Sequence, residues 1–240
     1  MASLLEQYND LSKDEQSALG QVSSRIRTPG CHLVEIASMY EIDGNRVKVD
    51  FKDASGATID YTGFLETKDK DGNVLPNART LNQLTFICNA IGMELGQVLA
   101  RGKATTLTFK KGDVPATEFP SVKGKKLYVT TTTEVEADQT NPDKVYVKQT
   151  LNPYKFFDAK KRNALEIASK ADEGVTMEAA DAEAKETFEV AYKSQGNPAA
   201  EAKLLEIQEK AQVSTAGSTV GQIPPSQTAT QAAAQDPDDI

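Results

Sequence analysis

Strict alternation of apolar and charged residues between two short turns is the feature that most limits what this chain can form. In the segment RVKVDFK at 46–52, the odd positions are Val, Val and Phe, and the even positions are Arg, Lys, Asp and Lys. This period of two predicts a β-strand with one buried face, because successive side chains of a strand point to opposite sides. The turns DGN at 43–45 and ASGA at 54–57 bound it, so we expect flanking strands at 32–42 and 58–67 and a three-stranded meander.

A helix and further strands follow the meander. NARTLNQLTFICNAIGM at 77–93 places its apolar residues at helical spacing. ATTLTFKK, KKLYVTTTTEVEA and KVYVKQTLNPYKFF then return to strand character, and we expect Pro153 to end the regular pairing of the last one. This order predicts a mainly β fold with α appendages. The specific expectation is an OB-like Greek-key barrel with a helix between strands 3 and 4, although other small barrels and α+β sandwiches share parts of the order.

The chain divides into four predicted parts. Apolar residues at helical spacing indicate helices both at the start and after the last strand, and a low-complexity stretch without aromatic residues indicates a disordered tail. The parts are an N-terminal helical segment, an OB-like domain, an acidic helical region and the tail: 1–25, 26–158, 159–212 and 213–240.

Charge is distributed unevenly along the 240 residues. The net charge is −8, yet residues 101–162 carry 13 basic and 7 acidic side chains. Although the whole chain is acidic, the basic segment in its middle is compatible with binding of nucleic acid. We expect no membrane-spanning segment and no signal peptide, because no apolar run is long enough and the first residues are acidic and polar.

Chemistry-bearing motifs are scarce. His32 is the only histidine, and Cys31 and Cys88 are expected to be free thiols. Neither a phosphate-binding glycine loop nor a nucleophile elbow occurs, and DKDG at 69–72 indicates a hairpin turn rather than a calcium loop. We therefore predict no catalytic residues, no metal, no cofactor and no enzymatic activity.

Aromatic residues interleave with the cations of the basic middle. Single-stranded nucleic acid requires this combination, because cations neutralise phosphates and flat rings stack on bases without reading them. The alternative is that the rings face the core and the lysines only solvate the surface. The predicted DNA contacts are Arg46, Lys48, Tyr61, Phe64, Arg101, Lys103, Lys110, Lys111, Lys123, Lys125, Lys126, Tyr128, Tyr146, Tyr154 and Lys155.

Several segments resemble a known family. PGCHLVEIASMYEI, DYTGFLETKDKDG, TLNQLTFICNAIGM and LNPYKFFDAKKRNALEIASKA are similar in pattern to the phage-encoded single-stranded DNA-binding proteins of viral replication, over roughly residues 26–171. The resemblance implies an OB-fold and binding of single-stranded DNA without sequence preference, in replication or recombination. It also implies residence in the cytoplasm of the infected host cell and an acidic C-terminal tail that contacts replication proteins such as a polymerase, helicase or primase.

The C-terminal stretch is similar in layout to the tails of such proteins. STAGSTVGQIPPSQTATQAAAQDPDDI is a polar linker that ends in a few acidic residues and one apolar residue. It departs from many relatives in its short acidic run and in ending on isoleucine rather than an aromatic residue. The predicted partner-binding residues are Asp236, Asp238, Asp239 and Ile240.

Two other readings stay open at this point. The chain could be a structural or assembly protein of a virion with no nucleic-acid role, in which the helical region packs against other copies. It could also be a small enzyme whose paired carboxylates the sequence does not single out. The chain could also form a homo-oligomer.

Overall fold

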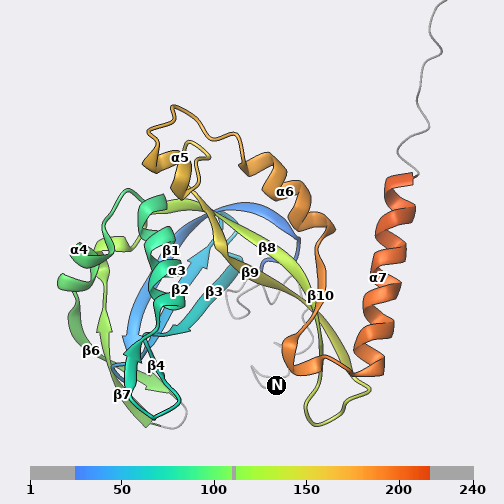
Figure 1. Ribbon diagram of the computed structural model, residues 1–240, viewed down its shortest axis with the longest axis horizontal. Coiled ribbons are helices and arrows are strands. Elements are labelled where there is room, and N and C mark those ends of the chain that lie inside the picture. The colour runs from blue at the N-terminus through green and yellow to red at the C-terminus, as the bar shows by residue number, and fades with distance from the viewer. Residues whose placement is uncertain (1–24, 110–111, 217–240) are drawn as a thin grey trace, which may run out of the picture.

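The computed structural model describes residues 25–109 and 112–216 (Figure 1). Within these ranges the fold is mainly β, with a large, mostly antiparallel sheet and few helices, as the sequence predicts. Outside them lie most of the expected N-terminal helical segment, two predicted DNA contacts and the tip of the tail: 1–24, Lys110, Lys111, Asp236, Asp238, Asp239 and Ile240.

The predicted meander is confirmed. β1 (Gly30–Ile42), β2 (Arg46–Lys52) and β3 (Thr58–Phe64) pair in antiparallel order. The three apolar residues of β2 are buried, and its charged residues lie on the opposite face. Alternation in the sequence therefore located both the strand and its inner face.

The helix predicted after the meander is also present. A small hairpin, β4 (Glu66–Lys68) with β5 (Val74–Pro76), comes first. α3 (Ala78–Ala90) then begins at Asn77, whose side chain accepts a hydrogen bond from the Thr80 amide at 3.3 Å. The inner face of α3 packs into the core over the sheet, and the short α4 (Leu95–Ala100) follows. The first turn of α3 lies beside the end of β3, where the Thr80 side chain is next to Gly63.

The next hairpin contains a strand that the sequence did not predict. β6 (Lys103–Phe109) pairs with β7 (Gly112–Glu118), which is the strand that was not predicted. The last residues of β7 also pair with Tyr40–Ile42 at the end of β1. After the short 3-10 helix Pro120–Val122, β8 (Lys126–Ala137) pairs with the first residues of the same edge of β1. The same edge of β1 therefore pairs with β8 near its start and with β7 near its end.

The sheet is open between β3 and β9 (Val145–Phe157). β9 pairs with β8, giving the strand order β9-β8-β1-β2-β3. Its register shifts between Leu151 and Phe156, so the expected interruption at Pro153 is present, but pairing resumes beyond it. Among the described strands no pairing joins β3 to β9, so the predicted closed barrel is not confirmed.

The C-terminal region is mostly helical, as predicted, and packs on the sheet. α6 (Met177–Glu186) lies against β1 and β8, and α7 (Pro198–Ala216) stands beside β10 (Phe188–Val190) and contacts the far end of β8, where Ala200 and Val135 belong to one apolar cluster (Figure 1). A short parallel strand beside β8 was not predicted, and α7 continues past the predicted helix end at residue 212. The elements are α5 (Ala164–Ala168), α6 (Met177–Glu186), β10 (Phe188–Val190), a 3-10 helix (Tyr192–Ser194) and α7 (Pro198–Ala216).

The absence of a side chain at Gly30 allows α6 to pack closely against the start of β1. The φ of Gly30 is +121°, and an added Cβ would lie 2.6 Å from Oδ1 of Asp181, which accepts a hydrogen bond from the Cys31 amide at 2.7 Å. We expect Gly30→Ala to lower the free energy of unfolding by about 2 kcal/mol, measured by urea denaturation. Gly56→Ala is the control, because Gly56 also has a positive φ but no atom within 4 Å of the added Cβ. Equal losses in the two variants would contradict the importance of this contact.

Candidate nucleic-acid interface

A groove runs along the open side of the sheet, between β3 and β9. Its volume is about 610 Å³, and its walls come from β3, the first turns of α3 and the middle of β9. A second hollow of about 410 Å³ adjoins it and shares Arg79, Thr150, Leu151 and Pro153 with it. The hollow continues toward α6 and β10. The two spaces together form a path across β9.

Basic side chains outnumber acidic ones on the groove wall. Its charged residues are Arg25, Arg79 and Lys148 against Asp60. Arg25 forms an ion pair with Asp60 at 2.7 Å, and Lys148 forms ion pairs with two glutamates of β8. Arg79 makes no ion pair with another described residue and instead lies 5.8 Å from the centre of the Tyr154 ring. A cation held beside an exposed ring suits a phosphate that follows a stacked base.

Two exposed rings lie along this path. Phe64, at the end of β3, lines the groove and is 56% exposed. Tyr154, in the irregular part of β9, lines the adjoining hollow and is 49% exposed. The Tyr154 ring is supported by Phe86, at a centroid distance of 6.5 Å in an edge-to-face arrangement. Both rings therefore have accessible area for stacking, and Tyr154 also rests on Phe86.

Tyr61 differs from its predicted role. Its side chain is only 5% exposed, and its hydroxyl donates a hydrogen bond to Oε1 of Gln83 at 2.7 Å. Burial raises the pKa of this hydroxyl. The ring points into the core together with Ile59, so Tyr61 supports the wall of the groove and does not present a free face to a base.

The structure distributes the other predicted contacts over separate surfaces. Arg46 and Lys48 stand on the outer face of β2, where Lys48 pairs with Asp50 at 2.6 Å. Lys155 pairs with Glu183 at 2.5 Å in the hollow that adjoins the groove. Elsewhere lie the residues before and in β6, those of the turn entering β8, and the β8–β9 ribbon: Arg101, Lys103, Lys123, Lys125, Lys126, Tyr128 and Tyr146.

Sequence reasoning missed the three cations of the groove. Arg25, Arg79 and Lys148 belong to a connecting segment, a helix and a strand that are far apart in the chain. Of the three, only Lys148 could have been singled out from the sequence, because it is a charged residue that directly follows the apolar run VYV in a predicted strand.

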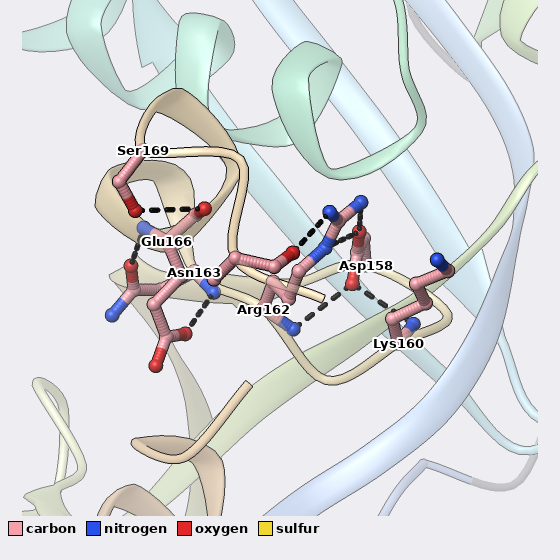
Figure 2. A network of polar contacts seen from close by, with 7 residues as sticks. Asp158, Lys160, Arg162, Asn163, Glu166 and Ser169 are labelled. Atoms are coloured by element: carbon pink, nitrogen blue, oxygen red, sulfur yellow. Dashed lines mark hydrogen bonds and ion pairs between the residues drawn. The ribbon is translucent and has the colours of Figure 1, made fainter. Parts of the chain in front are cut away.

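A polar network fixes the turn that leads from β9 to α5 (Figure 2). The Asp158 carboxylate accepts hydrogen bonds from the amides of Lys160 and Arg162, each at 2.9 Å, and from Nε of Arg162 at 2.8 Å. Asn163 and Glu166 form a capping box at the start of α5. Burial alone raises the pKa of Asp158, but its hydrogen bonds and the Arg162 charge outweigh burial and hold the pKa below its ordinary value.

Comparison with known proteins returns no relative on which a function could rest. A scan against protein-family models finds no match, and a search of curated proteins finds none that is significant. In the described part of the chain, no helix is both long and apolar enough to cross a membrane. The same residues contain no cluster of three or more potential metal-binding side chains of the His, Cys, Asp and Glu types.

Proposed function

We propose that the protein binds single-stranded DNA without sequence preference, and that the strand lies in the groove between β3 and β9. The observation that carries this proposal is the pair of exposed rings, Phe64 and Tyr154, along one path. The groove part of the path has three basic residues and one acidic residue on its wall, and the adjoining hollow adds Lys155 and three glutamates, Glu134, Glu183 and Glu189. Rings supply stacking that every base accepts, and cations supply attraction for the phosphates. A single strand can offer both groups at once, whereas the bases of a duplex are stacked inside.

The strand order supports an OB-like interpretation of the sheet. A meander, a helix after its third strand and two further long strands give the order β9-β8-β1-β2-β3, which is that of an OB barrel opened at one seam. We propose that the domain is such an incompletely closed Greek-key barrel. The groove is the gap between β3 and β9, where the barrel is open. The DNA strand enters the domain at this gap.

Acidic neighbours modulate the attraction of the groove for phosphate. Arg25 and Lys148 are already paired with carboxylates, so a phosphate has to share or replace these partners. Such exposed pairs stabilise the protein little, by about 0–1 kcal/mol each, and exchange at small cost. Arg79 has no such partner among the described residues, so we assign it the strongest single phosphate contact.

The biological setting follows from the sequence resemblance. We propose a phage protein that coats exposed strands during replication or recombination in the cytoplasm of the infected cell, with no catalytic turnover. Its tail would recruit replication proteins through three carboxylates and the terminal apolar side chain, Asp236, Asp238, Asp239 and Ile240. These four residues lie outside the described ranges, so this part of the proposal rests on sequence alone.

A titration with labelled oligonucleotides tests the function. We expect a single strand to bind more tightly than a duplex of the same length. If the three groove cations neutralise three phosphates, log affinity should fall with log salt at a slope of about −2, since each phosphate contributes about −0.7. Between about 50 mM and 200 mM salt the affinity then drops about fifteenfold. Equal binding of duplex would contradict the groove, and no binding at low salt would favour the virion structural or assembly role.

A further inference from the structure

Another pocket, more apolar than the groove and its adjoining hollow, lies beyond Tyr154. Its volume is about 380 Å³, and it is enclosed by α3, the end of β9, α5 and α6. Aromatic and aliphatic side chains form most of its lining: Phe86, Tyr154, Phe156, Phe157, Ala164 and Leu165. Leu165 is 80% exposed although it is a large apolar residue, so the pocket has an apolar rim as well as an apolar interior.

The pocket is continuous with the proposed DNA path. Tyr154 and Lys155 line both this pocket and the hollow that adjoins the groove. A strand that follows the groove past Arg79 therefore reaches the mouth of the pocket at the Tyr154 ring. Lys155 provides a positive charge at the same boundary, held at 2.5 Å from a carboxylate oxygen of Glu183.

The outer wall of the pocket is built to keep its shape. Asn163 and Thr176 line it, and they are joined by a hydrogen bond of 2.8 Å from Nδ2 of Asn163 to Oγ1 of Thr176. Oδ1 of Asn163 accepts from the amides of Leu165 and Glu166, each at 2.9 Å. Asn163 and Thr176 are thus engaged within the protein, and the other polar residues of the lining, Lys155 and Glu183, are ion-paired with each other, which leaves shape and apolar contact as the main means of recognition.

We propose that this pocket takes one nucleobase of the bound strand, turned out of the stack at Tyr154 and packed against the aromatic lining. The proposal rests on the proposed function and deepens it. A flat base with apolar faces matches a pocket lined by the partly exposed rings Phe86 and Tyr154 and, behind them, by the nearly buried Phe156 and Phe157, and its phosphate remains outside near Lys155. Because the polar groups of the wall are already bonded, the pocket accepts any base. It therefore adds affinity without sequence preference.

Filling the pocket from α6 tests this directly. Ala179 is an exposed residue of α6 on the pocket wall, and Ala179→Leu extends a side chain into the space. Ala182→Leu is the matched control, because Ala182 is exposed on the same helix but lines the hollow that faces α7. We expect A179L to bind an oligothymidylate about tenfold more weakly than the parent, and A182L to bind like the parent.

An abasic oligomer of the same length separates base contact from charge. It keeps every phosphate but has no base for the pocket, so the parent and A179L should bind it equally. The salt slope of A179L should match that of the parent, because no phosphate contact is lost. Ala164→Leu enters the same pocket from α5 and should repeat the loss if A179L folds poorly.

The outcomes distinguish this inference from the proposed function. If the parent itself binds no single strand, the proposed function fails. If the parent binds a single strand, and both A179L and A164L bind oligothymidylate as tightly as the parent does, the pocket holds no base. A peptide of a partner protein then becomes its better occupant. An equal loss on the abasic oligomer, or an equal loss in A182L, would also overturn the inference.

Discussion

Replacing Phe64 and Tyr154 together by alanine should weaken binding of single-stranded DNA roughly a hundredfold. Each ring that stacks on one base contributes about 1–3 kcal/mol, and 1.4 kcal/mol corresponds to a factor of ten. Both side chains are about half exposed, so their removal opens no large cavity in the core. Fluorescence anisotropy with a labelled oligonucleotide measures the affinity, and thermal unfolding confirms that the double variant is folded.

Tyr192→Ala provides the control for this experiment. Tyr192 is 86% exposed and lies in the 3-10 helix after β10, outside the groove and its adjoining hollow. Its loss should leave the affinity unchanged. The variant F64L/Y154L retains apolar bulk without rings and should be nearly as weak as F64A/Y154A. Unchanged affinity in F64A/Y154A, or an equal loss in Y192A, would contradict stacking at these two positions.

Gly174→Ala should be the most destabilising of the glycine substitutions proposed here, by about 3 kcal/mol. A Cβ at this position would lie 1.8 Å from the carbonyl oxygen of Lys161 and 2.6 Å from the amide nitrogen of Arg162. These are main-chain atoms of the turn in Figure 2, held by Asp158, so they cannot move aside without breaking that network. Urea denaturation of the parent and the variant measures the difference.

Gly96→Ala makes a contrasting control. Gly96 lies in α4 with no atom within 4 Å of an added Cβ, so alanine should raise stability by about 0.5–1 kcal/mol through its better helix propensity. A G174A variant that unfolds at the same urea concentration as the parent would show that the turn yields easily. The α5–α6 wall of the apolar pocket would then not be rigid.

The sequence predicted those parts of the fold whose residues carry their own period. The meander and α3 followed from alternation and helical spacing, since each forms its inner face from neighbouring residues. β7 has Pro115 in its centre and no clear alternation, and β10 has only three residues. β7 is a strand because it pairs along its whole length with β6 and at its end with β1, and β10 is a strand because β8, distant in sequence, offers it an edge.

Sequence patterns likewise indicated only some of the residues that line the candidate site. Phe64 and Tyr154 were predicted as contacts and line the path, but Tyr61 was grouped with Phe64 although the two residues lie three positions apart in one strand. An odd separation puts them on opposite faces, and the structure places Tyr61 inside. The grouping of Arg25, Arg79 and Lys148 depends on the opening between β3 and β9, which no local pattern encodes.

Photochemical cross-linking of an oligothymidylate to the intact protein, with mass spectrometry of the linked peptides, tests most directly whether a single strand occupies the groove. Thymine excited by ultraviolet light links to the side chains it contacts, with rings among the most reactive. The predicted result is linkage at Phe64 and Tyr154, lost from each site when that residue is replaced. Linkage confined to the turn that carries Lys123, Lys125 and Lys126, with none at either ring, would contradict the placement of the strand between β3 and β9.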